Sequence, residues 1–468
     1  MDMKKNKNYF LRQCVLAACL SAAVAGTVFA NENTFVQGTT INGLGVSGMT
    51  VEEARTRIAE FYSGEYQLKI LERGGVHEVI QGTEIGFAIG IPIERLQELL
   101  QQENEGGRKS GPDVNAKFRV EMTNSYDAAA LTAKIDGLNC IRGESIAQTT
   151  DAHISAYEEG KPFTIVPEVY GNNVDAAKVA EAVQRAVAAG DREVDLEKEG
   201  CYIAPQITAD NQGLKELCDT MNRCREMTVT YQFGEETEEL LPETICSWIT
   251  GYSEGQILLD QEKLMAYVGD LANRRSTAGR PRMFSTVNGA QVELTGPYGW
   301  VVNIAGEAAA LTAQIQTGES QTREPVYAAV AASRTEPDWG TTYVEVDIGG
   351  QHVYVIQNGQ LVWEAPCVTG SVARGSITPA GIYSITYKQR DRVLRGPKRA
   401  DGTYEYESPV AYWMPFNGGI GLHDANWRGS FGGNIYRTSG SHGCVNLPPS
   451  KVPALYEMVY PGMPVICY

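Results

Sequence analysis

The clearest structural signal in the chain is Tyr343-Val-Glu-Val-Asp-Ile-Gly-Gly-Gln-His-Val-Tyr-Val-Ile-Gln-Asn-Gly-Gln-Leu-Val-Trp-Glu364. Three runs rich in β-branched and aromatic residues, at 343–348, 352–356 and 360–364, favour extended strands. The runs are separated by Gly-Gly and Asn-Gly, which are residue pairs that tight hairpin turns favour. The segment therefore predicts three consecutive antiparallel strands.

The sequence around this meander continues the same pattern. Strand-like runs recur at Gly381–Tyr387, Pro409–Met414 and Pro464–Tyr468, with long connections between them. From Thr341 to Tyr468 the chain holds nine acidic and ten basic residues, whereas the whole chain has a formal charge of −17. We therefore expect residues 341–468 to form a separate, mostly β, sandwich-like domain with long loops.

The length and composition limit the number of domains and the class of protein. A length of 468 residues suggests about three domains. A hydrophobic content of 43% with 21% charged residues is ordinary for a globular protein and excludes a disordered or collagen-like chain. The net negative charge argues against nucleic acid as a partner, because phosphate contacts need a basic face.

The N-terminus resembles an export segment. Basic residues up to Arg12 precede an uncharged run from Cys14 to Ala30, which is the arrangement of an export signal. We expect residues 1–30 to be either a cleaved signal peptide or a retained membrane anchor, and both alternatives stay open. In either case the rest of the protein is expected to work outside the cytoplasm.

The export segment leads into an extended stretch and a helix, which together occupy residues 31–61. Glycines punctuate the sequence up to Gly48, and Thr50 with Glu53 forms a capping box. This box predicts a helix that runs to about Tyr62.

Two later blocks resemble each other. In each block a Tyr-Gly pair precedes a helical pattern that ends in a second glycine. The two glycines are nineteen residues apart in both blocks, at Gly171 and Gly190 in the first and at Gly299 and Gly318 in the second. The repeated spacing indicates an internal duplication.

The duplication extends upstream of these blocks. Each is preceded by a hairpin-like strand pair, and we match a helix near Ile93–Leu100 in the first copy to one near Gln261–Leu271 in the second. The chain is therefore predicted to be multidomain, with two α+β repeats at 62–196 and 214–327 in front of the β domain. Neither repeat contains a catalytic constellation.

Ten cysteines are present, of which eight lie beyond residue 30. Their wide spacing does not suit a small disulfide scaffold, and no Cys-X-X-Cys pair suggests a zinc site. We expect buried thiols with one or two bridges, whose pairing the sequence leaves open, among Cys140, Cys201, Cys218, Cys224, Cys246, Cys367 and Cys467. No metal or cofactor is expected.

Cys444 is different, because its neighbours carry chemistry. It lies in Ser441-His442-Gly443-Cys444-Val445-Asn446, and His423 precedes it by 21 residues. An imidazole can activate a thiol as a nucleophile, and successive backbone amides beside it can bind an oxyanion. The glycine-rich segment 425–438, which contains Trp427, is expected to be a mobile flap. These residues indicate thiol-dependent acyl transfer or hydrolysis.

The order and spacing of His423 and Ser441-His442-Gly443-Cys444-Val445-Asn446 resemble the signature of the L,D-transpeptidase (YkuD) catalytic domain. The earlier Thr369-Gly370 and Thr378-Pro379-Ala380-Gly381 also resemble that family's T-G and T-P-x-G segment. The two repeats resemble the tandem peptidoglycan-binding domains that precede this catalytic domain in many members. Asn446 stands where many members have arginine, although asparagine also occurs.

The resemblance implies an acyltransferase of the cell wall, which forms 3→3 cross-links through a cysteine thioester taken from tetrapeptide stems. Its partners would be peptidoglycan stem peptides and glycan strands, and the membrane if the N-terminal segment is retained. It would act at the cell wall or the outer face of the cytoplasmic membrane. The implied roles are Cys444 as nucleophile, His423 as general base and acid, the Asp424 carbonyl as its orienting group, His442 and Gly443 in the oxyanion pocket, and Ser441, Asn446 and Trp427 in substrate binding.

The sequence also leaves other functions open besides cross-linking. Water as the acceptor would make the protein an L,D-carboxypeptidase, and a non-catalytic wall-binding protein is a third possibility. A sortase-like ligase would need an arginine downstream of Cys444, where only Lys451 is basic. The basic cluster Lys388–Arg399 is expected to be a solvated loop, with attraction of anionic stem peptides or wall polymer as the functional alternative.

Overall fold

The computed structural model describes residues 32–106 and 116–468. The expected export segment at residues 1–30 lies outside these residues. In the described ranges no helix is both long enough and apolar enough to span a membrane. The chain divides into two compact units, one containing the described residues up to Thr150 with Val169–Gln206, and the other Asp151–Glu168 with Ile207–Tyr468.

The first unit begins with a small module at the N-terminal side. Strands β1 (Thr40–Ile41), β2 (Leu44–Gly45) and β6 (Lys117–Phe118) form one sheet beside α1 (Val51–Gly64) and α2 (Ile93–Glu105). The predicted capping box of Thr50 and Glu53 is confirmed at the start of α1. Apolar side chains from both helices and from the N-terminal stretch form a hydrophobic cluster of their own.

The first repeat is a three-stranded sheet covered by helices. Its β3 (Gln67–Leu71) and β4 (His77–Gln81) form a hairpin, and β10 (Glu193–Asp195) pairs parallel with β3. Helix α5 (Ala176–Ala189) precedes β10 and ends at Gly190, which has φ +76° as the predicted terminal glycine requires.

The second repeat, in the other unit, has the same topology. Strands β11 (Val229–Phe233) and β12 (Glu236–Leu240) form the hairpin, and β18 (Gln321–Arg323) pairs parallel with β11 after α9 (Ile304–Ile315). The predicted internal duplication is therefore confirmed as a repeated arrangement of strands and helices.

One detail of the predicted duplication is wrong. Helix α8 (Gln261–Arg275) follows the β13–β14 hairpin (Ile249–Ser253, Gln256–Leu259) and contacts α9. In the first unit, β5 (Ala88–Gly90) pairs with β7 (Thr123–Ser125), and α3 (Ala128–Asp136) follows and contacts α5. The counterpart of α8 is therefore α3. The predicted counterpart, α2, belongs to an insertion between β5 and β7 that packs on the N-terminal stretch.

The remaining elements of the two repeat regions are short. They are β8 (His153–Ile154), β9 (Ile165–Val166), β15 (Arg282–Ser285), β16 (Gln291–Leu294), β17 (Val301–Val302), β19 (Tyr327–Ala329), η1 (Arg73–Gly75), η2 (Gly82–Ile85), α4 (Asn139–Arg142), α6 (Gln212–Arg223) and α7 (Pro242–Ser247). Hairpin β15–β16 matters for the next domain because Phe284 and Leu294 pack against Ile382 and Ile466 there.

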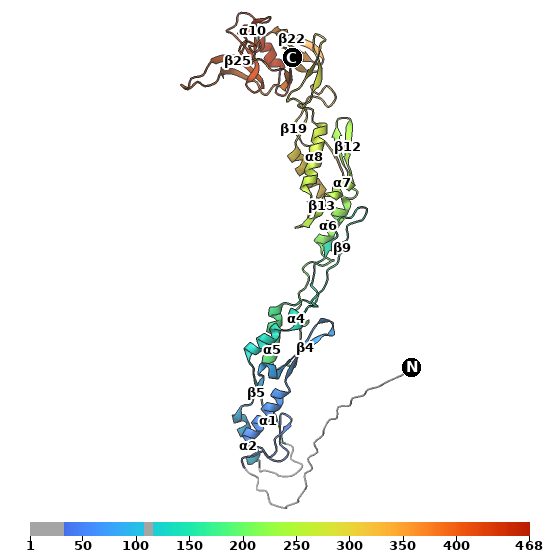
Figure 1. Cartoon of the computed structure of the whole chain (residues 1–468), viewed down its shortest axis with the longest axis vertical. Helices are drawn as coiled ribbons and strands as arrows, with labels where there is room; N and C mark the ends of the chain where they lie inside the picture. Colours follow the sequence, from blue (N-terminus) through green and yellow to red (C-terminus); the bar gives the residue numbers. More distant parts are fainter. Residues whose placement is uncertain (1–31, 107–115) are drawn as a thin grey trace, which may run out of the picture. The chain divides into compact units, whose positions relative to one another are not determined.

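The C-terminal domain is the predicted β sandwich (Figure 1). Its first sheet has the order β22-β21-β20-β28-β23 and its second the order β24-β25-β26-β27. The predicted meander is confirmed, with Asn358 and Gly359 at positive φ in the second turn. The strands are β20 (Tyr343–Asp347), β21 (His352–Gln357), β22 (Gln360–Pro366), β23 (Gly381–Ser384), β24 (Gln389–Arg395), β25 (Glu407–Asn417), β26 (Ile420–Asp424), β27 (Val445–Leu447) and β28 (Pro464–Cys467).

Both sheets contribute to one core. Val344 and Val465 of the first sheet share a buried cluster with Met414, Leu422 and Val445 of the second. Two short helices, α10 (Ile435–Ser439) and α11 (Val452–Met458), complete the domain. Because β26 and β27 are adjacent parallel strands of the second sheet, the register places His423 beside Asn446, two residues after Cys444.

Candidate active site

The loop that carries Cys444 is a tight turn before β27. The hydroxyl of Ser441 donates to the Cys444 carbonyl at 2.5 Å and accepts from the Gly443 amide at 3.0 Å. Gly443 has φ +122°, a conformation that side chains disfavour. The predicted role of the Gly443 amide in an oxyanion pocket stays a prediction, since in this structure that amide bonds to Ser441.

The Thr369–Thr378 segment holds this turn from outside. The hydroxyl of Thr378 donates to the Gly443 carbonyl at 2.6 Å and accepts from the Gly370 amide at 3.0 Å. A side chain on Gly370 would place its Cβ 2.0 Å from the Ser376 carbonyl oxygen, so the Thr369–Thr378 segment can fold back on itself this tightly only because residue 370 is glycine. The T-G and T-P-x-G residues therefore shape the cysteine loop.

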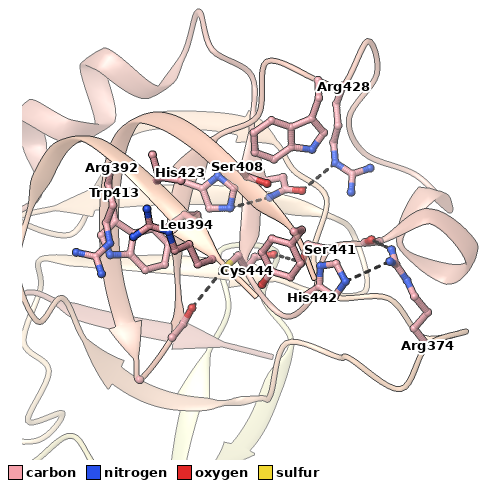
Figure 2. A pocket seen from close by; sticks show the side chains of 18 of the residues that line it. Arg374, Arg392, Leu394, Ser408, Trp413, His423, Arg428, Ser441, His442 and Cys444 are labelled. Atoms are coloured by element: carbon pink, nitrogen blue, oxygen red, sulfur yellow. Dashed lines mark hydrogen bonds between the residues drawn. The ribbon is translucent and has the colours of Figure 1, made fainter. Parts of the chain in front are cut away.

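A cavity of about 420 Å³ lies at this loop (Figure 2). Six of the sequence-predicted site residues line it: His423, Trp427, Ser441, His442, Cys444 and Asn446. Asp424 and Gly443 touch the site through backbone groups. The structure thus brings the predicted nucleophile and the predicted base to one cavity.

The imidazole of His423 is buried and held in one orientation. Its Nδ1 lies 2.8 Å from the Asp424 carbonyl oxygen, which can only accept, so Nδ1 carries the proton. Burial lowers the pKa of His423 to about 4, so the ring is neutral and Nε2 carries a lone pair that can accept a hydrogen bond. Trp413 and Trp427 flank the imidazole, each with its ring centre 5.9 Å away.

Asn446 occupies that lone pair in this structure. Its Nδ2 lies 2.9 Å from His423 Nε2, and its Oδ1 accepts from Arg428 Nε at 2.8 Å. Arg428 in turn donates to the Ser439 carbonyl at 2.8 Å. Sequence reasoning placed Asn446 in substrate binding, and the structure shows that its amide contacts the imidazole.

The thiol of Cys444 is protonated at rest. Its Sγ lies 3.5 Å from the Gly419 carbonyl oxygen, to which the thiol donates. Burial raises the pKa of Cys444 to about 11. A neutral thiol and a neutral imidazole therefore face the same cavity.

The other seven described cysteines are buried free thiols. The expected one or two bridges are therefore wrong for the part of the chain that the structure covers. In the first unit Glu72, Glu78 and Cys140 each place one atom within 4.8 Å of the others. The Glu78 carboxylate is already bonded to the side chain of Asn139 and the Cys140 amide.

Part of the cavity wall comes from a strand that the sequence did not reveal. The basic cluster expected to be a solvated loop contains β24, which pairs with β25 along most of its length. Arg392, Leu394 and Arg395 of this strand line the cavity, together with Tyr406, whose ring stacks on His442 at 4.4 Å. Alternating charged residues concealed the strand, because its outer face is solvated.

Residues 425–438 were expected to form a mobile flap; residues 425–434 are turns and bends, and the rest of the segment belongs to α10. Trp427 is half exposed and lines the cavity. Arg374 was missed by sequence reasoning, since it lies in a loop with no motif. It donates to the Gly440 carbonyl, and its Nη1 lies 3.4 Å from His442 Nε2.

A buried neutral imidazole, a thiol and a glycine-rich turn line one cavity of a β sandwich, and these are the groups that acyl transfer through a cysteine would need. Residues 341–467 match the family model of the L,D-transpeptidase catalytic domain, and residues 93–195 match that of a peptidoglycan binding domain. The chain belongs to the L,D-transpeptidase family.

Solved structures agree with this membership at the level of sequence. A cysteine-to-serine mutant of the Enterococcus faecium L,D-transpeptidase is 34% identical, with 54% of this chain and 100% of that chain covered and a TM-score of 0.44. The catalytic domain of the Enterococcus faecium enzyme is 42% identical over 27% of this chain and 96% of that chain, with a TM-score of 0.25.

A Mycobacterium smegmatis L,D-transpeptidase is 21% identical over 43% of this chain and 85% of that chain, with a TM-score of 0.27. A search among curated proteins found no match. The family membership thus follows from the family models and from the Enterococcus faecium sequences.

Proposed function

We propose that this protein forms 3→3 cross-links in peptidoglycan through a thioester on Cys444, and that it does so outside the cytoplasm at the cell wall or the outer face of the membrane. The observation that carries the proposal is that Cys444 and the neutral, oriented His423 line one cavity. The match to a peptidoglycan binding domain supports wall peptides and glycan strands as partners.

The first half-reaction forms the thioester. The proton of the Cys444 thiol passes to His423 Nε2, once Asn446 has yielded that lone pair, and sulfur attacks the carbonyl between the third and fourth residues of a tetrapeptide stem. The backbone amides of His442 and Cys444 would then stabilise the oxyanion. The carbon–nitrogen bond breaks, and His423 returns the proton to the leaving amine of the fourth residue.

The second half-reaction resolves the thioester. An amine of a neighbouring stem attacks the carbonyl and loses a proton to His423, and the carbon–sulfur bond breaks as Cys444 takes the proton back. If water takes the place of the amine, the product is a shortened stem, and the protein acts as an L,D-carboxypeptidase. A non-catalytic wall-binding role would leave the cavity without covalent chemistry.

Mass spectrometry of muropeptides made by the purified protein tests the proposal. We expect dimers joined through the third residues of both stems, and none from a Cys444→Ala variant. The Enterococcus faecium catalytic domain has been captured acylated by ertapenem. The same carbapenem should therefore add to this protein, and Cys444→Ala should abolish the adduct. Cross-linked product from Cys444→Ala would refute the mechanism.

The role of the base is tested separately. His423→Ala should slow carbapenem acylation of Cys444 by about 100-fold or more, because general-base catalysis typically contributes that much. Stopped-flow absorbance of the carbapenem measures the rate. A Trp427→Phe variant, which keeps an aromatic ring beside His423, serves as a control for disturbance of the cavity. An unchanged rate in His423→Ala would remove His423 from the reaction.

A further inference from the structure

Two arginines on one wall of the cavity lack a carboxylate partner. Arg374 donates to the Gly440 carbonyl and Arg428 to the Ser439 carbonyl, so both guanidinium groups are held at the C-terminal end of α10. Among the residues that the structure describes, neither of them forms an ion pair. Of the other two arginines that line the cavity, Arg395 is paired with Glu407 and Arg392 donates to the side chain of Gln389.

The position of these two charges has an energetic consequence. Burial and the neighbouring charge of Arg374 both lower the pKa of Arg428, so Arg428 is partly dehydrated and lies near a second cation. Like charges placed together without a counter-ion are unfavourable unless a ligand supplies the negative charge. The wall is therefore suited to an anion that arrives with the substrate.

Both guanidinium groups lie next to the reacting side chains. Arg428 contacts Asn446, which contacts His423 Nε2, and Arg374 contacts the ring of His442, two residues before Cys444. Figure 2 shows Arg374 and Arg428 on the same side of Cys444, with Arg392 on the other side. An anion bound by the pair would thus lie close to the scissile bond.

We propose that Arg374 and Arg428 form a subsite for the C-terminal carboxylate of the donor peptide, on the residue that is released when the thioester forms. The proposal rests on the proposed function and assigns substrate selection to these two residues. In a tetrapeptide donor that carboxylate is separated from the attacked carbonyl by one nitrogen and one Cα, a span of about 4 Å or less. Guanidinium groups bind carboxylates through paired, charge-assisted hydrogen bonds.

The site would make the enzyme selective for stems that end one residue beyond the scissile bond. A longer stem would move its carboxylate away from the arginines and leave them uncompensated. A carboxylate on the acceptor peptide is another source of the same chemistry, and it is separated from the donor by acylating the enzyme in the absence of acceptor.

The test compares two donor tetrapeptides, one with a free C-terminal carboxylate and one with a C-terminal carboxamide. The rate of acyl-enzyme formation is measured by intact-protein mass spectrometry without an acceptor. We expect the wild-type protein to prefer the free acid by about ten- to a hundredfold, as charge-assisted hydrogen bonds imply. In Arg374→Gln the preference should fall toward one, and Arg428→Lys should retain part of it.

Arg392→Gln is the matched control, because it removes one positive charge from the opposite wall. It should keep the wild-type preference even if its absolute rates change. A structural disturbance in Arg374→Gln would slow both peptides alike and leave the ratio unchanged, and that result would overturn the proposal. Equal acylation of the wild type by both peptides would overturn it too. Failure of both peptides to acylate Cys444 would overturn the proposed function and this site with it.

Discussion

His423 lies in a short chain of hydrogen bonds that runs from Arg428 through Asn446 to the Asp424 carbonyl. The groups at the two ends determine the direction of every bond between them. Arg428 can only donate and the Asp424 carbonyl can only accept, so Asn446 must present its Nδ2 to His423 Nε2. Asn446 therefore caps His423 Nε2 in this structure. In the proposed mechanism, His423 can take the Cys444 proton only after Asn446 has left Nε2 or the imidazole has moved away from it.

Asn446→Asp tests this chain through its pH dependence. A carboxylate beside the imidazole favours the imidazolium and so raises the pKa of His423 from about 4. Because only the neutral ring accepts a proton, the acidic limb of the pH–rate profile for carbapenem acylation should move to higher pH. Asn446→Ala is the control, since it removes the contact without adding charge. An unshifted limb in Asn446→Asp would contradict the contact.

Burial of His423 also links folding to pH. Its pKa is lowered to about 4 in the folded protein from an ordinary value near 6.5, so the unfolded chain binds the additional proton. The free energy of unfolding should therefore decrease as the pH falls from about 6.5 to about 4. Urea titrations across this range, on the wild type and His423→Gln, measure it. An equal decrease in both proteins would assign the effect to other groups.

That Cys444 and His423 line one cavity could be predicted from the sequence, because both belong to a local motif with fixed spacing. The contact between Asn446 and His423 could not be predicted, because the sequence does not show toward which neighbour a side-chain amide points. The same holds for Arg374, which reaches His442 from a loop 68 residues earlier in the chain.

At the scale of elements, Thr378 connects two segments that form the site. Its hydroxyl bonds both to the Gly443 carbonyl and to the Gly370 amide, and the side chain is buried. The T-P-x-G segment thus acts on the cysteine loop through one hydroxyl group.

Thr378→Val keeps the shape of this side chain but removes both hydrogen bonds. Leaving a buried carbonyl and a buried amide without partners should lower the free energy of unfolding by about 1–3 kcal/mol per unsatisfied group. Acylation of Cys444 should also slow, because the loop is no longer held. Thr378→Ser, which restores the hydroxyl, should recover most of both losses in denaturation and acylation assays. A fully stable and active Thr378→Val would exclude this role.

Element prediction succeeded where turns and hydrophobic periods were clear and failed where they were masked. The Asn358-Gly359 turn determined the meander, and the capping box at Thr50 located α1. Strand β24 was missed because its exposed charged residues follow a pattern that is typical of a solvated loop. The helix near Ile93–Leu100 was matched to the wrong counterpart because α2, which belongs to an insertion, has a helical pattern and precedes α3 in the sequence.

At the scale of the whole molecule, the second repeat and the catalytic domain share a hydrophobic cluster. Phe284 and Tyr298 pack there with Trp339, Ile382 and Ile466. A buried ion pair between Arg282 and Asp338, at 2.7 Å, lies beside it. The two domains are therefore joined by a core as well as by the chain.

Phe284→Ala should destabilise the protein by about 3–5 kcal/mol, because it leaves a cavity in this cluster. The loss should appear in thermal unfolding followed by near-ultraviolet circular dichroism. Met283→Ala is the matched control on the same strand, since Met283 is 57% exposed while Phe284 is 1% exposed. Equal effects of the two substitutions would show that the cluster does not contribute to stability.

The eight thiols of the described chain have one further consequence. Oxidants attack the thiolate much faster than the thiol, and seven of these sulfur atoms are shielded by burial. Cys444 lines the cavity and is only partly buried, and its thiol donates to the Gly419 carbonyl. In an oxidising medium, this arrangement would slow conversion of the Cys444 thiol to sulfenic acid. The enzyme would thus keep its reactive sulfur intact between encounters with its substrate.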